Sequence, residues 1–283
     1  MSREKWFIQP GESRVIDTGI IRALKVALIA GTIDVIGHDE DTARIEVNDV
    51  TGRDLKVTID GDTLEIDHPQ LRWENFIDTF KAFGPNKASA AVSVLVPRSI
   101  DLSFGVVNAT ALVSGLETDA RLSTVSGEIG ADSLTGDVEL NAVSGALNVS
   151  NHTGTVSVHT VSGDVTAAGE ITKLTGDTVS GDVFIDATGS CDRIRVNSMS
   201  GNVTARVDAD LGARCVLNTV SGRMHVDGRT VDGTFGRGYS MTTTGSSNFT
   251  VEVTANTVSG DISMIRRADA GSPYSVDADG AVQ

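Results

Sequence analysis

The side chains that could perform acid–base, nucleophilic or metal chemistry are few in this sequence and stand far apart. The histidines have no metal-ligand spacing with one another or with the cysteines: they are His38, His68, His152, His159 and His225. Cys215 falls on an inward strand position and is expected to be a small core residue. Cys191 lies in the expected turn TGSCD, which predicts an exposed thiol. We therefore predict no catalytic residue, no metal site and no enzymatic activity.

Two further patterns could bind an ion or a cofactor. Glycine followed by aspartate recurs, as in Gly163-Asp164 and Gly181-Asp182. One carboxylate per repeat supplies too few ligands for calcium, and the glycine-rich nonapeptide of calcium-binding β-rolls is absent from the sequence. The sequence also contains no phosphate loop and no dinucleotide fingerprint. We therefore predict no cofactor.

The composition is typical of a soluble chain with a narrow aliphatic core. Of 283 residues, 40% are hydrophobic but only 4% are aromatic, and 30 are glycine, so small and β-branched side chains must fill the interior. The formal charge of −15 argues against binding to nucleic acid or to an anionic membrane. We see no signal peptide and no transmembrane segment in the sequence. These features predict a cytoplasmic protein without a direct membrane span.

A three-residue phrase of an aliphatic residue, serine and glycine recurs along the chain. It ends at Gly115, Gly127, Gly145, Gly163, Gly181, Gly201, Gly222 and Gly260. From Gly127 the steps are 18, 18, 18, 20, 21 and 38 residues. We interpret the last step as two steps of 19, with a degenerate phrase inside GRTVDGTFGRG. A fixed period of this length is typical of repeat architectures.

Alignment of the copies on the glycine shows columns of like residues. Two and four positions after each glycine from Gly127 onward the residue is apolar, as in Leu147 and Val149, and the residue between glycine and the first column is mostly polar. This alternation predicts short β-strands with one buried face. An antiparallel meander would not require like residues to recur at every second strand, whereas stacked coils would. We therefore predict an all-β parallel β-solenoid, or β-helix, with about 18–21 residues per coil.

A second set of columns precedes the glycine. Four positions before it stand Asn141, Asn197, Asn218 and Asn256, and the next position is mostly threonine. Stacked asparagine side chains can hydrogen-bond from coil to coil, and stacked threonines can do the same. The alternative is a polar stripe that binds a ligand. We favour the structural ladder because it explains the recurrence without a ligand.

The N-terminal third is less regular. Residues 1–20 are expected to cap the first coils, and Asp60-Gly61 predicts a hairpin turn. Residues 71–87 have apolar side chains at helical spacing and predict an inserted amphipathic helix. Its apolar residues are the candidate partner-binding residues: Leu71, Trp73, Phe76, Ile77, Phe80 and Phe83. The helix is interpreted either as a flap packed on the solenoid or as a docking element for a partner protein or a membrane interface.

Three stretches of the sequence resemble the bacterial putative-adhesin repeat family, a domain of unknown function: AVSVLVPRSIDLSFGVVNATALVSGL, LSTVSGEIGADSLTGDVELNAVSGALNVS and HTVSGDVTAAG. The resemblance covers about residues 15–265. It implies a right-handed, single-stranded β-solenoid without recognised catalytic residues. Similar domains occur beside membrane segments and envelope-stress components, which implies a sensing or scaffolding role. We expect one solenoid domain over residues 1–265 and a disordered tail over 266–283.

The sequence is compatible with three functions. The leading hypothesis is a non-enzymatic interaction scaffold with an unknown protein partner, linked to envelope-stress sensing. The second is an exported surface adhesin or glycan binder. The third is a carbohydrate-active β-helix enzyme, which would need a groove lined with several carboxylates. A homo-oligomer formed through the solenoid ends is a further alternative.

Overall fold

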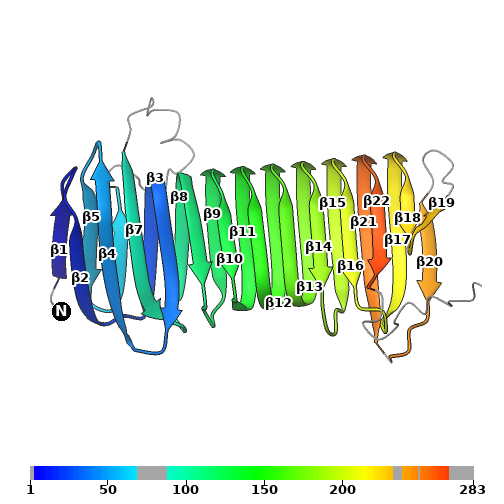
Figure 1. Cartoon of the computed structure of the whole chain (residues 1–283), viewed down its shortest axis with the longest axis horizontal. Coiled ribbons are helices and arrows are strands. Elements are labelled where there is room, and N and C mark those ends of the chain that lie inside the picture. Colours follow the sequence, from blue (N-terminus) through cyan, green and yellow to red (C-terminus); the bar gives the residue numbers. More distant parts are fainter. Residues whose placement is uncertain (1–2, 69–87, 232–237, 248, 268–283) are drawn as a thin grey trace, which may run out of the picture.

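The protein is an elongated stack of β-strands (Figure 1). The computed structural model describes residues 3–68, 88–231, 238–247 and 249–267. These residues form 22 strands, and no helix occurs among them. The predicted all-β architecture is therefore confirmed for the described part of the chain.

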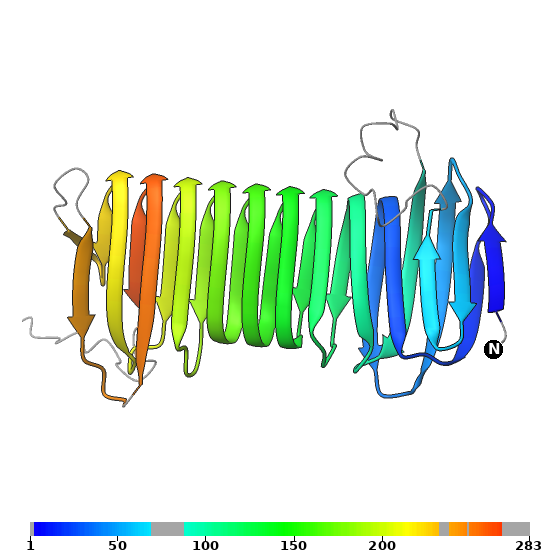
Figure 2. The same ribbon diagram turned by 180° about the vertical axis from the view of Figure 1, so that it is seen from behind.

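The middle of the stack consists of coils that pair in parallel with their neighbours, seen from both sides in Figures 1 and 2. Its strands are β8 (Asp101–Ser114), β9 (Ala120–Ser126), β10 (Ile129–Asp132), β11 (Thr135–Ser144), β12 (Leu147–Ser162), β13 (Val165–Ser180), β14 (Val183–Ala187), β15 (Arg193–Ser200) and β16 (Val203–Val207). Leu147 pairs with Val165, and Val165 pairs with Val183. Like residues thus stack directly on like residues, as the columns predicted.

Each coil contributes one strand to each of two rows. One row runs from the first half of β8 through β9, β11, the second halves of β12 and β13, and β15. The other runs from the second half of β8 through β10, the first halves of β12 and β13, β14 and β16. Inward residues such as Leu140 and Val149 are fully buried and belong to one aliphatic core. The narrow core explains why so few aromatic residues are needed.

The glycine of the repeated phrase is required by close backbone approach. Gly163 has a φ of 132°, where side-chain-bearing residues are strained. A Cβ added there would lie 2.0 Å from the carbonyl oxygen of Gly145 in the preceding coil. Gly145 is related to Gly127 in the same way. The glycine column therefore sets how closely the coils stack.

Stacking order departs from sequence order near the C-terminal end. The coil of β21 (Thr250–Ser259) and β22 (Ile262–Arg266) lies between the β15–β16 coil and the coil of β17 (Gly212–Ser221) and β18 (Met224–Val226). The prediction of a degenerate coil between Gly222 and Gly260 is wrong for the described residues. The described residues there form β19 (Arg229–Val231) and β20 (Tyr239–Thr243), which pair antiparallel with β18 and β17.

The N-terminal end shows a similar rearrangement. β3 (Ala23–His38) pairs in parallel with β8 on one side and with β6 (Thr63–Asp67) and β7 (Ser89–Pro97) on the other. Beyond them lie antiparallel strands: β1 (Arg3–Ile8), β2 (Arg14–Ile20), β4 (Thr42–Thr51) and β5 (Leu55–Asp60). The predicted turn at Asp60-Gly61 joins β5 to β6 in an antiparallel hairpin. Antiparallel strands thus close both ends of the parallel stack.

Two sequence predictions fall at the limits of the described residues. The predicted helix over residues 71–87 lies outside them, as do all six of its candidate partner-binding residues. The expected tail boundary at 266 needs correction, because Arg266 ends β22 and Arg267 donates its backbone N–H to the Val207 carbonyl.

We predict that Gly163→Ala destabilises the fold by about 3 kcal/mol or more, because it adds backbone strain and a clash with the adjacent coil. Gly228→Ala is the matched control, since Gly228 also has a positive φ, of 75°, but a Cβ there would meet nothing within 4 Å. The control should lose only about 1–2 kcal/mol. Urea unfolding of both variants measures the difference. Equal losses would show that coil spacing does not depend on the glycine column.

Candidate functional site

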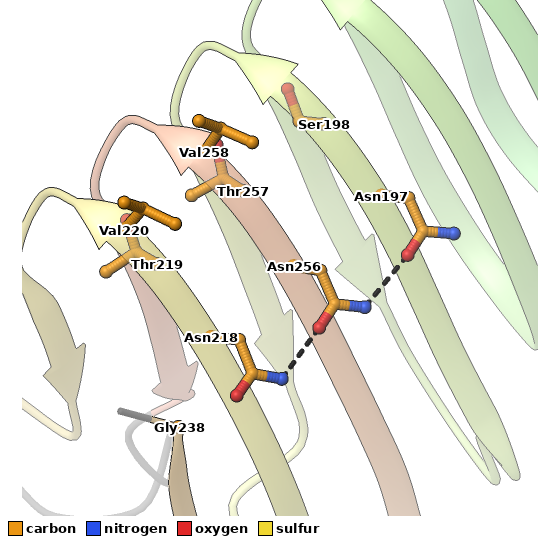
Figure 3. Close-up of a pocket in the computed structure, with 9 residues that line it drawn as sticks. All are labelled: Asn197, Ser198, Asn218, Thr219, Val220, Gly238, Asn256, Thr257 and Val258. Carbon is orange, nitrogen blue, oxygen red and sulfur yellow. Dashed lines mark hydrogen bonds between the residues drawn. The ribbon is translucent and has the colours of Figure 1, made fainter. Parts of the chain in front are cut away.

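A shallow groove runs along one flank of the stack, beside the repeated phrase. Over the coils of β9, β11, β12 and β13 it forms a cavity of about 560 Å³. It continues over β15, β21 and β17, where a pocket of about 180 Å³ is bounded by Gly238 (Figure 3). Each coil contributes three consecutive residues: an outward polar residue, a buried small residue and an outward aliphatic residue. The groove is therefore built from three parallel columns.

The polar column is a ladder of side-chain amides and carboxylates. Asn256 donates to the Oδ1 of Asn197 at 2.8 Å, and Asn218 donates to the Oδ1 of Asn256 at 2.7 Å (Figure 3). Asn197 in turn donates to Asp177 at 2.8 Å. Asp177 also faces His159, whose Nδ1 lies 3.3 Å from its Oδ2. The predicted asparagine ladder is confirmed for Asn197, Asn256 and Asn218, whereas Asn141 donates to Glu139 of its own strand.

The aliphatic column, here called the valine row, is exposed. Its side chains have exposed fractions between 45% and 58%. In stacking order they are Val143, Val161, Val179, Met199, Val258 and Val220. This row is not among the binding residues predicted from the sequence. The signal was present, because each valine immediately follows an inward residue and alternation therefore places it on the outside.

Buried hydroxyl groups form the floor between the two outward columns. Thr160 and Thr178 donate to carbonyls of their own coils, and Thr219 donates to the carbonyl of Gly260 in the adjacent coil. The hydroxyls of Thr124, Ser198 and Thr257 are buried without a hydrogen-bond partner. The prediction that stacked threonines hydrogen-bond to one another from coil to coil is therefore wrong.

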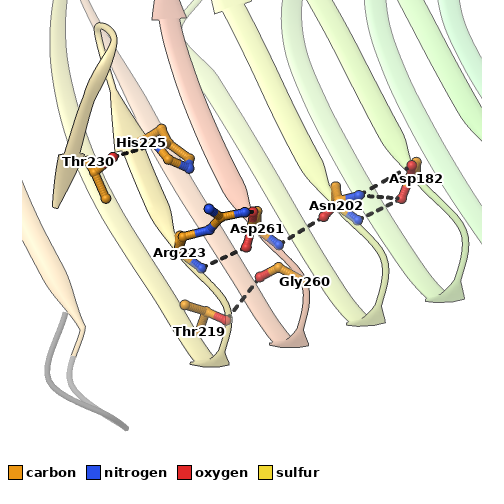
Figure 4. A network of polar contacts seen from close by, with 8 residues as sticks. All are labelled: Asp182, Asn202, Thr219, Arg223, His225, Thr230, Gly260 and Asp261. Carbon is orange, nitrogen blue, oxygen red and sulfur yellow. Dashed lines mark hydrogen bonds and ion pairs between the residues drawn. The ribbon is translucent and has the colours of Figure 1, made fainter. Parts of the chain in front are cut away.

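The residue after the repeated glycine, an aspartate in the recurring Gly-Asp pairs, hydrogen-bonds to the backbone of the adjacent coil (Figure 4). The Oδ1 of Asp182 accepts the backbone N–H of Asn202 at 2.8 Å, and the Oδ1 of Asn202 accepts that of Asp261 at 3.0 Å. The Oδ1 of Asp261 accepts the backbone N–H of Arg223 at 2.8 Å, which lowers the pKa of this aspartate. These side chains fasten one coil to the next, so they are not free to act as ligands.

Neither a metal-binding cluster nor an exposed thiol occurs among the described residues. No group of three or more histidine, cysteine, aspartate or glutamate side chains among them could hold a metal ion. Cys191 was expected to be exposed, and this was wrong: it is 2% exposed, and burial raises the pKa of its thiol to about 12. Cys215 is buried as predicted, and burial raises its thiol pKa to about 11. The groove residues offer hydrogen-bonding groups and apolar surface.

The structure does not bring the sequence-predicted site residues to this groove. Leu71, Trp73, Phe76, Ile77, Phe80 and Phe83 all lie outside the described residues. The described residues that flank them, His68 and Ala88, are buried. Within the described part of the chain, no helix is long and apolar enough to cross a membrane.

Comparison with known proteins identifies a family. Residues 21–265 match the family described as Toastrack DUF4097. None of the curated proteins matches this sequence.

Several solved structures are similar at low sequence identity. One is described as a putative cell adhesion protein from Clostridium sporogenes (16% identity, 94% of this chain and 99% of that chain covered, TM-score 0.28). Another is a putative lipid binding protein from Parabacteroides distasonis (11% identity, 92% and 99% covered, TM-score 0.47). A third is a putative adhesin from Bacteroides fragilis (13% identity, 91% and 100% covered, TM-score 0.39).

We predict that protein stability falls between pH 6.5 and pH 4 through His68. Its side chain is fully buried, its Nδ1 accepts the backbone N–H of Ile29 at 3.3 Å, and burial lowers its pKa to about 4. The unfolded chain therefore binds a proton first as the pH falls, and up to about 3 kcal/mol of stability is lost. His68→Asn keeps an acceptor for Ile29 but does not titrate. Urea unfolding at pH 7 and pH 4 should show a smaller loss for this variant, and an equal loss would contradict the prediction.

We also predict that neither native cysteine reacts rapidly with a maleimide in the folded protein at pH 8. Both thiols are buried and their pKa values are raised, so the reactive thiolate is scarce. Val161→Cys places a thiol on the valine row and serves as the positive control. Mass spectrometry should find rapid labelling of that residue alone until urea unfolds the chain. Rapid labelling of wild type would show that the core opens readily.

Proposed function

This chain belongs to the Toastrack DUF4097 family, and we propose that it acts as a non-enzymatic interaction scaffold whose binding surface is the groove with its valine row. The scaffold is a stiff, acidic rod that holds this surface in a fixed geometry. Its partner is a protein that covers the aliphatic side chains and hydrogen-bonds to the amide ladder. The link to envelope-stress sensing rests on the family resemblance.

The valine row is the observation that supports this proposal most strongly. Six aliphatic side chains in successive coils are about half exposed and form one continuous stripe. Contiguous exposed apolar surface bordered by polar residues marks interaction sites in soluble proteins. Here the border is the ladder of Asn197, Asn256 and Asn218. An aliphatic stripe beside regularly spaced amides suits a partner with both apolar and hydrogen-bonding groups along an extended surface.

The handedness and topology of the coils are also part of the proposal. We propose that the coils form a right-handed, single-stranded β-solenoid. The constant offset of 18 residues between paired strands such as β11 and β12 supports it. In such a winding every coil presents the same three columns to the same flank, so the length of the groove scales with the number of coils.

The groove favours binding over hydrolysis of a glycan. Glycoside hydrolysis uses two carboxyl groups on either side of the scissile bond. Among the described residues that line the larger part of the groove, Asp177 is the one carboxylate, and it pairs with His159 and Asn197. A glycan-binding, exported adhesin remains the second candidate, because amide side chains are suitable partners for sugar hydroxyls.

We predict that Val143→Ser/Val161→Ser/Val179→Ser weakens partner binding about 100-fold. Each valine should contribute about 1 kcal/mol through burial of its methyl groups in the complex. Val15→Ser/Ile20→Ser is the matched control, because these side chains are equally exposed but lie on β2, away from the groove. The partner is first identified by affinity capture on the wild-type chain and mass spectrometry, and then titrated against each variant by calorimetry.

Three results would distinguish the groove proposal from the other hypotheses. If Trp73→Ala/Phe76→Ala abolishes binding and the valine variant does not, the partner docks on residues 71–87 and the groove proposal is wrong. If the wild type binds glycans on an array and the valine variant does not, the adhesin hypothesis replaces the protein scaffold. Release of reducing sugar from a polysaccharide would overturn the non-enzymatic proposal itself.

A further inference from the structure

The coil of β21 and β22 occupies a slot between two coils that precede it in the sequence. In Figure 1 its orange and red strands lie between the yellow strands of neighbouring coils. β21 pairs in parallel with β15 on one edge and with β17 on the other. β22 pairs in the same way with β16 and β18. The backbone hydrogen-bonding groups on both edges of the inserted coil are therefore paired. The two coils that pair with them follow each other directly in the sequence.

The slot can also close without its occupant. Val196 and Leu217 both pair with Ala255, and Val203 and Met224 both pair with Ile262. The two flanking coils thus share one register and the same inward columns. If the inserted coil leaves, the flanking coils can stack directly on each other with like residues aligned. Release of the coil therefore leaves few unpaired strand edges on the flanking coils.

A single connection rich in small residues ties the inserted coil to the preceding part of the stack. Residues 244–249, TGSSNF, connect β20 to β21 in the sequence, and the described residues Ser247 and Phe249 cross beside Asp210 and Gly212. The backbones touch at this crossing: Ser247 donates to the Asp210 carbonyl at 2.9 Å, and Gly212 donates to the Phe249 carbonyl at 3.0 Å. No described strand follows β22. The inserted coil can leave the slot when these contacts open, without unthreading another described strand.

Two arginines clasp the end of the inserted coil to both sides of the slot. Arg266 pairs with Asp227, which follows β18. Arg267 pairs with Asp208 and Asp186, on the side of β16 and β14. All of these aspartates lie in the coils that border the slot, and none lies in residues 244–249. The same clasp would hold an identical coil from another molecule equally well.

We propose that two copies of this chain exchange the coil formed by β21 and β22, so that each copy fills the slot of the other in a strand-swapped dimer. All contacts inside the slot are the same whether the coil comes from its own chain or from a second copy. Exchange of an identical element is a low-cost route to a dimer, and a hinge of small residues allows it. The slot must also open during folding, because its occupant is synthesised after both of its walls.

Full-length chains in which Cys191→Ala and Cys215→Ala remove the native thiols, each with one new cysteine, test the exchange. Asn197→Cys and Asn256→Cys are placed on separate copies, which are mixed, unfolded, refolded together at high concentration and oxidised. Neighbouring parallel strands bring these positions to about 5 Å between Cα atoms, within the span of a disulfide. We expect a disulfide-linked heterodimer on a non-reducing gel, because position 256 of one copy then lies beside position 197 of the other.

Two controls make every outcome decisive. Asn141→Cys mixed with Asn256→Cys uses the same exposed column on a distant coil, so an equal yield of dimer there would indicate lateral association and overturn the proposal. The second control is a chain that carries both Asn197→Cys and Asn256→Cys and is oxidised in its folded state before the unfolding and refolding step. It should remain monomeric in size-exclusion chromatography, because the internal disulfide locks the coil in its own slot. If this double variant forms its internal disulfide while the mixed single variants give no dimer, the coil never leaves its own copy and the proposal is wrong.

Discussion

The close contact between stacked backbones at the repeated glycine is the constraint on which the rest of this structure depends. The carbonyl oxygen of one glycine lies where the Cβ of the next would be, as between Gly145 and Gly163. Only glycine permits this approach at a positive φ. Because every coil is held at the same spacing, residues of one column lie within reach of each other. Core packing, the asparagine ladder and the turn network all follow from that regular spacing.

Regular stacking also determines what kind of surface the protein can offer. A side chain that points outward in one coil points outward in all of them, so a single valine in the repeat becomes an exposed row. Most recurrent polar groups are engaged in joining coils, as Asp182 and Asn202 are. The valine row has no such structural partner. It is therefore the part of the repeat that is available for binding another molecule.

The ends of a parallel stack create a separate physical problem. An uncovered end coil would expose a full edge of unpaired backbone groups and invite other strands to add to it. Here antiparallel strands cover both ends, with β1 and β2 at one and β19 and β20 at the other. The chain reaches these positions only by leaving sequence order. After each set of capping strands, the chain returns to the interior of the stack. It does so through β3 at one end and through the β21–β22 coil at the other.

The sequence by itself determined the faces and the period of the repeat. Alternation placed Leu147 and Val165 inward, and the columns predicted that they stack, because side-chain direction in a strand is a local property. It also predicted the ladder through Asn197, although not that Asn256 lies between Asn197 and Asn218. Only the tertiary structure decided that order. All coils share the same columns, so each fits beside any other, and the choice is made by connections and end contacts such as Arg267 with Asp208. The burial of Cys191 was likewise decided by packing, because a turn sequence does not reveal which neighbouring coil covers it.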